Sequence, residues 1–333
     1  MFAALDLGTN NCRLLIVASG RSGVKVIDNY NRVVRLGEGL YETGVLSEAA
    51  MSRTLSALHH CADRIEKRKL FQLYAVATEA CRRAKNASDF LGKVHKETGL
   101  NINVITSREE VELAVAGCAT LFHDKLLRRN RTKSLLFDIG GGSTEIAWVR
   151  MDVLRGKQTL IGCHSIPVGV ITLREQFKKL TLNEYYRMVE YVLDKMHSFE
   201  CIHQIRAEIF RDQVQLIGVS GTVTALASMI LKQPKYCRSA IDGLLLPTVQ
   251  LKDIIRQILT TKFNKIYDYS IVNHQRLQYL LPGCAIYEAI NTLWPVEDIV
   301  IADRGIRDGI IATMLQKKPL VSKNYRSRHA HNL

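Results

Sequence analysis

The segment Leu5-Asp6-Leu7-Gly8-Thr9-Asn10-Asn11-Cys12-Arg13-Leu14 aligns without gaps with Phe137-Asp138-Ile139-Gly140-Gly141-Gly142-Ser143-Thr144-Glu145-Ile146. Both segments carry an apolar residue, an aspartate, an apolar residue and a glycine, then a turn and a second strand-like run. A pattern that recurs in both halves of a chain indicates a duplicated structural unit. The sequence therefore predicts two α/β domains that each contain this β-hairpin.

Further strands and helices are predicted outward from the two hairpins. In the first half the strands are 2–7, 12–17, 24–28, 73–78 and 103–105, and the helices are 47–67, capped by Ser47, and 108–122. In the second half the strands are 134–139, 144–149 and 159–166, followed by strand-turn segments at 215–224 and 298–305. Hairpins come first and strands alternating with helices follow, so mixed sheets are expected.

A basic stretch, KLLRRNRTK at residues 125–133, separates the two halves and is the natural boundary. A chain of 333 residues suits two domains, because single cores usually stop growing below that size. We predict an N-terminal domain over residues 1–124, joined by a C-terminal helix over 305–318, and a second domain over 133–304. Residues 319–333 are predicted to be a basic, flexible tail.

The net charge of +14 is the unusual feature of the composition. It indicates an attraction for polyanions, which include nucleic acid, acidic lipid and long phosphate chains. No apolar run approaches the roughly 20 residues that span a bilayer, and no basic leader precedes the first strand, so neither a membrane protein nor a secreted one is expected. The eight cysteines never form CxxC, which favours reduced thiols and a cytoplasmic location.

The glycine turn of the second hairpin is the strongest candidate for chemistry. Gly140, Gly141 and Gly142 free the backbone to present several N–H groups to one anion, and Ser143 adds a hydroxyl. Asp138 and Glu145 flank the turn and could hold a divalent cation. The alternative is a hairpin turn with exposed polar residues. The flanking acids and the copy at Asp6 favour phosphate binding.

The first hairpin predicts a weaker phosphate loop. It offers Asp6 as an acid, Gly8 as the single glycine, and Thr9 and Asn10 as side-chain donors. Arg13 stands opposite Glu145 in the internal alignment. This difference suggests charge neutralisation by one half, and metal or water positioning by the other.

Three further candidates have structural interpretations of equal or greater weight. Gly221 and Thr222 lie at a strand-to-helix junction, where anion binding and ordinary capping by Ser220 are equally supported. Glu110 fits a capping box with Ser107, and this spacing favours a structural role. Arg82 fits a solvated basic helix face.

The ordered set of motifs resembles the exopolyphosphatase and guanosine pentaphosphate phosphohydrolase (Ppx/GppA) family. The matching segments run from about Ala3 to Met314 and include Asp6 to Asn10, Thr78 with Arg82 to Asn86, Glu109-Glu110, Asp138 to Glu145, Gly218 to Thr222 and Asp303 to Gly309. Each motif is weak alone, but the ordered set is specific.

This resemblance implies two ribonuclease-H-like domains of the actin, sugar-kinase and heat-shock-ATPase superfamily, with an interdomain cleft. It also implies hydrolysis of terminal phosphoanhydrides with Mg²⁺ or another divalent cation. The roles carried over are Glu110 as the base that orients water, Glu145 as its helper, Asp138 and Asp6 at the metal, and Arg82 at the phosphate chain. The phosphate-binding residues implied are Gly141, Gly142, Ser143 and Gly221.

We therefore expect an exopolyphosphatase, with a guanosine pentaphosphate 5′-phosphohydrolase as the alternative. The net charge favours the longer polyanion. An actin-superfamily kinase for small molecules and a non-enzymatic filament protein remain as other classes. Nucleic-acid binding is secondary because no interleaved aromatic platform is present. Longer family members carry additional C-terminal helical domains, and their lack here puts processivity in doubt. Enzymes of this size are often symmetric dimers, so a homodimer stays open.

Overall fold

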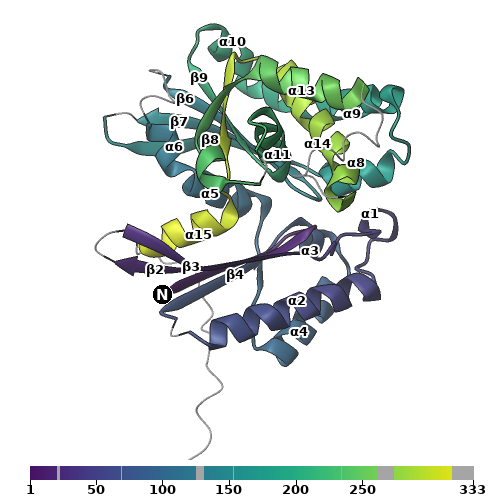
Figure 1. Cartoon of the computed structure of the whole chain (residues 1–333), viewed down its shortest axis with the longest axis vertical. Helices are drawn as coiled ribbons and strands as arrows, with labels where there is room; N and C mark the ends of the chain where they lie inside the picture. The colour runs from purple at the N-terminus through teal and green to yellow at the C-terminus, as the bar shows by residue number, and fades with distance from the viewer. Residues whose placement is uncertain are drawn as a thin grey trace, which may run out of the picture. The chain divides into compact units, whose positions relative to one another are not determined.

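The computed structural model describes residues 1–20, 23–68, 70–124, 131–152, 154–233, 235–260 and 274–316. The chain divides into two compact units, Met1–Glu109 with the chain from Ile306 onward, and Glu110–Gly305 (Figure 1). The predicted tail at 319–333 and most of the predicted linker, at 125–130, lie outside the described residues. No helix among the described residues is long and apolar enough to cross a membrane.

The first unit contains a five-stranded mixed sheet in the order β3-β2-β1-β4-β5. Its strands are β1 (Phe2–Leu7), β2 (Asn11–Gly20), β3 (Gly23–Val33), β4 (Gln72–Ala77) and β5 (Asn103–Val104). The first three pair antiparallel, and β4 lies parallel to β1 and β5. The predicted third strand is longer than expected because it pairs with the whole length of β2.

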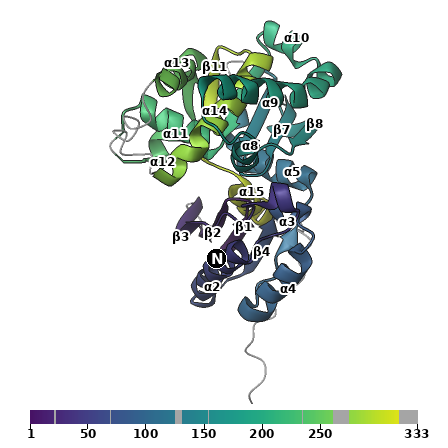
Figure 2. The same ribbon diagram turned by 90° about the vertical axis from the view of Figure 1, so that its right-hand side faces the viewer.

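The helices of the first unit cover its sheet on both faces. They are α1 (Leu40–Thr43), α2 (Glu48–Glu66), α3 (Glu79–Arg83), α4 (Ala87–Thr98) and α15 (Ile306–Leu315). Figures 1 and 2 show α2 and α4 on one face and α15 on the other. As predicted, Ser47 caps α2, accepting a hydrogen bond from the Ala50 N–H at 3.3 Å. Leu58 and Ile65 of α2 pack against the sheet in the core of this unit.

The second unit repeats this strand order in a six-stranded sheet, β10-β11-β9-β6-β7-β8. Its strands are β6 (Lys133–Ile139), β7 (Thr144–Asp152), β8 (Lys157–Ile166), β9 (Val214–Val219), β10 (Leu244–Pro247) and β11 (Asp298–Ala302). The strands β6, β7 and β8 pair antiparallel, and β9 lies parallel to β6 and β11. The predicted duplication is therefore present in the topology, with β10 added at one edge.

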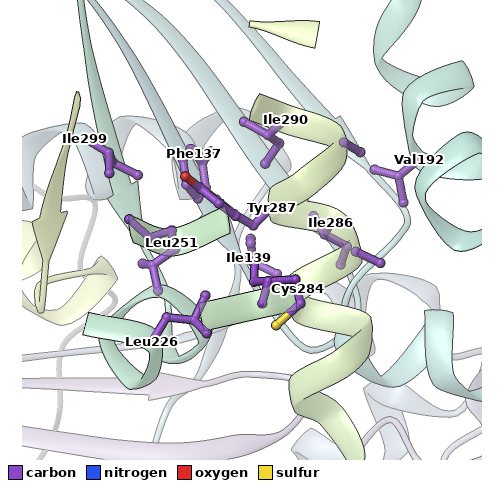
Figure 3. Close-up of a cluster of buried hydrophobic side chains, with 14 of the residues drawn as sticks. Phe137, Ile139, Val192, Leu226, Leu251, Cys284, Ile286, Tyr287, Ile290 and Ile299 are labelled. Atoms are coloured by element: carbon purple, nitrogen blue, oxygen red, sulfur yellow. The ribbon is translucent and has the colours of Figure 1, made fainter. Parts of the chain in front are cut away.

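Helices also cover both faces of the second sheet. They are α5 (Ser107–Gly117), α6 (Ala119–His123), α8 (Val170–Gln176), α9 (Leu182–His203), α10 (Ile205–Phe210), α11 (Gly221–Ile230), α12 (Arg238–Ile241), α13 (Thr248–Thr260) and α14 (His274–Leu293). The larger core lies between the sheet and α8, α9, α11, α13 and α14. In Figure 3, Tyr287 of α14 lies beside Phe137 of β6 and near Leu226 and Leu251.

The opposite face of the second sheet is covered by α5 and α6. Val111, Ala114 and Cys118 pack with Leu136 of β6 and Ala147 of β7. The sequence placed residues 107–124 before the domain boundary, whereas this packing groups α5 and α6 with the second sheet. The single helix expected over 108–122 is two helices, which meet at Cys118.

Candidate functional site

The two repeated hairpins close with the same backbone hydrogen bond. The Gly140 N–H donates to the Ser143 carbonyl at 2.9 Å, and the Gly8 N–H donates to the Asn11 carbonyl at 2.9 Å. The β2–β3 pairing shifts its register between Ile16 and Val17, and the β7–β8 pairing shifts between Trp148 and Val149, at the same distance from the aspartate of each hairpin. The internal alignment read from the sequence therefore corresponds to the same local structure in both units.

The carbonyl groups of the second turn are held from one side by the start of α8. The Val170 N–H donates to the Gly140 carbonyl at 3.0 Å, and the Ile171 N–H donates to the Gly141 carbonyl at 2.8 Å. Among the described residues, no acceptor is found for the N–H groups of residues 141–143. Several adjacent unused N–H groups form a concave site for an anion.

Gly169 allows the chain to approach this turn closely. A Cβ atom on Gly169 would lie 2.5 Å from the carbonyl carbon and oxygen of Gly141 and 2.6 Å from the Gly142 nitrogen. Such contacts with backbone atoms cannot be relieved by a side-chain movement, so position 169 must be glycine for the turn to keep this place. The sequence analysis did not identify Gly169, because no local pattern shows which glycine supports a distant turn.

Asp138 and Glu145 stand directly opposite one another in the β6–β7 pair. Opposite residues of an antiparallel pair project from the same face with Cβ atoms about 5 Å apart. Glu145 is only 3% exposed, and the Ser165 hydroxyl donates to its Oε1 at 2.9 Å. Its Oε2 lies 4.0 Å from the position that a Cβ on Gly140 would take. One carboxylate oxygen is thus anchored and the other lies beside the glycine turn.

Glu110 projects toward the same sheet face as these two acids. Asp138 alternates with Phe137 and Ile139, so it shares the face of Leu136, which α5 covers. Glu110 lies four residues before Ala114, and residues four apart share one side of a helix. Since Ala114 packs against this sheet face, Glu110 lies on the sheet-facing side of α5, where it is 7% exposed.

The capping box predicted for Ser107 and Glu110 is wrong by one residue. The Thr106 N–H donates to Glu109 Oε2 at 2.7 Å, and the Glu109 N–H donates to Thr106 Oγ1 at 3.2 Å. The physical reason is the preceding strand pairing, because the Ile105 N–H still donates to the Ala77 carbonyl at 3.0 Å. The cap therefore begins at Thr106, and Glu110 is not its carboxylate.

Asp6 of the first hairpin has a different electrostatic environment. It pairs across β1 and β2 with Arg13, and Arg307 of α15 is also near. Burial raises the pKa of Asp6, and the two arginines only partly oppose this effect. Arg307 is fixed by hydrogen bonds from its Nη1 to the Leu14 carbonyl at 3.3 Å and to Asn29 Oδ1 at 2.8 Å.

Two buried oxygen atoms of the first hairpin fit a hard cation or a bound water. Asp6 Oδ1 and Asn10 Oδ1 have no hydrogen-bond donor among the described residues. Mg²⁺ prefers such oxygen ligands and keeps several waters, using one or two carboxylates plus substrate phosphate. No group of three or more His, Cys, Asp or Glu side chains within the described parts of the chain could hold a metal. The residues present fit a magnesium ion that is completed by water and phosphate.

Thr9 and Arg82 have partners inside the first unit. The Thr9 methyl group fills the space where a Cβ on Gly37 would stand, 2.3 Å away. The Arg82 guanidinium donates to Glu79 Oε2 at 2.9 and 3.2 Å and to the Ile105 carbonyl at 3.0 Å. The exposed basic face expected for Arg82 is therefore a partly buried ion pair.

At the junction of β9 and α11, Ser220 caps the helix. Its hydroxyl accepts hydrogen bonds from the Thr222 and Val223 N–H groups, both at 3.1 Å. The Thr222 side chain packs against Gly283 of α14, where a Cβ would lie 2.1 Å from Thr222 Oγ1. A Cβ on Gly221 would meet no atom within 4 Å. Ser220 therefore caps the helix, as one of the two interpretations predicted. Gly221 is the residue at this junction with free space beside it.

The site residues read from the sequence fall into two groups. Those of the first unit are Asp6, Gly8, Thr9 and Asn10 in the β1–β2 hairpin, with Arg82 on α3. Those of the second are Glu110 on α5, Asp138, Gly140, Gly141, Gly142, Ser143 and Glu145 in the β6–β7 hairpin, and Gly221 and Thr222 at the start of α11. In each unit, most of the predicted site residues therefore lie in the hairpin.

Comparison with known proteins gives one family match. The model described as the Ppx/GppA phosphatase family matches residues 15–318. The structure of an Aquifex aeolicus PPX-GPPA enzyme is similar, with 26% identity, a TM-score of 0.75, and coverage of 94% of this chain and 98% of the other. An exopolyphosphatase from Cytophaga hutchinsonii is similar in fold, with 22% identity, a TM-score of 0.82, and coverage of 95% and 97%. The predicted fold class, two α/β domains of the actin-like ATPase type, is confirmed.

Proposed function

The chain belongs to the Ppx/GppA phosphatase family, and from this premise we propose that it is an exopolyphosphatase. It releases terminal orthophosphate from inorganic polyphosphate by attack of water. One observation carries the proposal, which is the backbone of the 140–143 turn. Its carbonyls are held by the start of α8, while the N–H groups of residues 141–143 have no acceptor among the described residues.

In the proposed reaction, the terminal phosphoryl group binds to these N–H groups and to the Ser143 hydroxyl. Asp138 would hold a magnesium ion, and Asp6 is proposed as a residue that would add a further ligand. When bound, this ion neutralises charge on the phosphate oxygens. We propose that the remaining phosphates of the substrate contact Arg82 and Gly221. Gly8, Thr9, Asn10 and Thr222 are proposed as further phosphate-binding residues. Phosphoryl transfer of this kind depends on positioning and electrostatics.

The attacking water is proposed to be oriented by Glu110 with the help of Glu145. The water oxygen forms a bond to the terminal phosphorus as the bridging P–O bond breaks, and Glu110 takes the proton of the water. The products are orthophosphate and a chain one phosphate shorter. Support comes from the low exposure of Glu110, from its position on the sheet-facing side of α5, and from the Thr106–Glu109 cap that replaces its expected structural role.

Polyphosphate is preferred over guanosine pentaphosphate in this proposal because of the net charge of +14. Each additional phosphate of a long polyanion can find another cation, and such attraction raises the association rate. We also propose a cytoplasmic location. All eight cysteines lie in the described parts of the chain and are free thiols, five of them buried.

The decisive experiment measures phosphate release from long polyphosphate, short polyphosphate and guanosine pentaphosphate in parallel, with and without Mg²⁺. The proposal expects release to depend on Mg²⁺ and kcat/KM to be highest for the long chain. Glu110→Gln should bind substrate normally and lose at least about 100-fold in kcat. Phosphate transfer from ATP to an acceptor, without release, would indicate a kinase instead. A higher kcat/KM for guanosine pentaphosphate would assign the nucleotide as the main substrate.

A further inference from the structure

The loop that follows β3 holds the tip of the first hairpin. The Val34 and Arg35 N–H groups both donate to the Asn10 carbonyl, at 2.8 and 3.0 Å, and the Gly37 N–H donates to the Thr9 carbonyl at 3.0 Å. Among the described residues, no acceptor is found for the N–H groups of Thr9 and Asn10. The carbonyls of this tip are therefore bonded, while its two adjacent N–H groups remain for an anion.

The second hairpin is supported in an equivalent way. The internal alignment of the two hairpins continues without gaps, so that Gly37 corresponds to Gly169 and Arg35 corresponds to Pro167. Each of the two glycines lets the chain approach its hairpin turn more closely than a residue with a Cβ atom could. The supports are therefore alike, but the residue two positions before the glycine differs between them.

Arg35 has a backbone conformation that arginine rarely adopts. Its φ is 49°, in the left-handed region, whereas the ring of Pro167 fixes φ at about −65° in the second unit. The duplicated unit therefore does not require a left-handed residue at this position. Glycine would adopt this conformation without the steric cost that a Cβ atom brings. An arginine held at such a position indicates that its side chain has a use that offsets the strain.

The backbone of Arg35 is fixed, but its side chain has no partner in the first unit. Val34 and Leu36 on either side are fully buried. Arg53 of α2 donates from its Nε to the Val34 carbonyl at 3.1 Å and from its Nη2 to the Arg35 carbonyl at 3.4 Å. The partly buried Arg35 guanidinium makes no hydrogen bond or ion pair with any described residue. An uncompensated cation therefore begins beside the two unused N–H groups of the hairpin tip.

On the basis of the proposed phosphatase function, we infer that Arg35 is a further phosphate-binding residue, which acts with the tip of the first hairpin. Its guanidinium binds oxygens of a phosphate group that also accepts from the Thr9 and Asn10 N–H groups. The planar guanidinium presents two parallel N–H donors, which match two oxygens of one phosphate. The ligand class is a condensed phosphate chain, either inorganic or attached to a nucleoside, because the contact involves phosphate oxygens alone.

The test measures binding of inorganic tripolyphosphate by calorimetry, at a fixed Mg²⁺ concentration, on the full chain carrying Glu110→Gln. Arg35→Gly should weaken binding about tenfold, which corresponds to about 1.4 kcal/mol, without lowering Tm, because glycine adopts the left-handed conformation freely. Arg35→Gln keeps the side-chain stem and should weaken binding by the same factor. Arg35→Lys keeps the charge without the paired donors and should weaken binding about threefold.

Lys232→Gly is the matched control. Lys232 is also a basic residue with a φ of 49°, and it lies just after the end of α11. Its replacement by glycine relieves the same kind of strain, so Tm should not fall and the tripolyphosphate affinity should stay within twofold. Arg35→Gly should match this control in Tm and differ from it in affinity.

A second probe, guanosine pentaphosphate, separates the two sources of phosphate. Arg35→Gly should weaken its binding as much as that of tripolyphosphate, since both ligands present the same oxygens. Unchanged tripolyphosphate affinity in Arg35→Gly and Arg35→Gln would overturn the inference, as would a loss confined to guanosine pentaphosphate. A lower Tm in both variants together with the lost affinity would show that the side chain supports the loop instead. Failure of the proposed function would appear separately, as absent phosphate release from the unmodified chain with the binding difference retained.

Discussion

Asp138 and Glu145 are cross-strand partners in the second hairpin, at the positions that Asp6 and Arg13 occupy in the first. The covering helices continue this difference, because α5 brings Glu110 to the sheet face of Asp138 and α15 brings Arg307 near Asp6. The same fold element therefore carries acids in one unit and an acid with two arginines in the other. The acidic set suits a metal and a water, and the two arginines of the mixed set add positive charge that suits an anion.

Replacing Glu145 by Gln should reduce activity without unfolding the hairpin. The glutamine keeps an oxygen for the Ser165 hydroxyl but removes the negative charge beside Gly140. We expect kcat to fall about 100-fold and the apparent Mg²⁺ affinity to fall, with Tm nearly unchanged. Ser165→Ala should lower kcat about tenfold, because it removes only the hydrogen bond that orients Glu145. Steady-state kinetics across a magnesium titration would measure both, and a kcat within twofold of wild type for Glu145→Gln would remove its role.

Substitutions at Thr106 and Glu110 of α5 should have different effects. The first should lower stability, and the second should lower activity. Thr106→Ala removes the capping hydroxyl and should lower the free energy of unfolding by about 1 kcal/mol while kcat stays within a few-fold. Glu110→Gln should leave the cap intact and abolish most turnover. Urea unfolding and phosphate release on the same two proteins provide the comparison. If Glu110→Gln destabilised the protein as Thr106→Ala does and kept its activity, Glu110 would be structural.

Gly169→Ala should disrupt the phosphate turn. The new Cβ would lie 2.5 Å from the Gly141 backbone, so either the turn or the start of α8 must move. We expect KM for polyphosphate to rise at least about tenfold and stability to fall by about 1–3 kcal/mol. Gly92→Ala is the matched control, since its Cβ meets no atom within 4 Å on the exposed side of α4, and it should stabilise by about 0.5–1 kcal/mol. Unchanged KM in Gly169→Ala would show that the turn tolerates displacement.

Replacing Asp6 by Asn should raise the free energy of unfolding by an amount that depends on pH. Because burial raises its pKa above the ordinary 3.8, the folded protein binds this proton more tightly than the unfolded chain does. Wild-type stability is therefore lost as the pH rises from the unfolded pKa through the folded one. Asp6→Asn escapes this loss, so its advantage in unfolding free energy should be near zero around pH 4 and grow toward pH 7. Denaturant melts at several pH values without Mg²⁺ test this, and an advantage that shrank with rising pH would contradict it.

The hairpins and the order of elements could be read from the sequence because both depend on local patterns. Alternation of apolar residues, the Asp-x-Gly turn and the Ser47 cap each act over a few neighbouring residues. The position of the α5 cap could not be read this way. Two overlapping capping boxes, starting at Thr106 and Ser107, fit the sequence equally, and the pairing of Ile105 with Ala77 selects the first.

The site features that the sequence did not predict depend on contacts between residues far apart in the sequence. Gly169 approaches Gly141, and Ser165 orients Glu145, only because β8 returns beside β7 with a specific register. The internal alignment predicted that Arg13 corresponds to Glu145, but not that α15 and α5 bring further charges of opposite sign near each hairpin. Such information lies in the packing of helices on the sheets and not in any short motif.

The closing bond of each hairpin turn joins only backbone atoms, from Gly140 to Ser143 and from Gly8 to Asn11. The turn therefore does not depend on the residue that faces the aspartate across the strands. The residue at position 13 or 145 can therefore differ in the sign of its charge while the hairpin keeps its closing bond. A scaffold of this kind allows two copies of one structural unit to differ in chemistry while they keep the same shape.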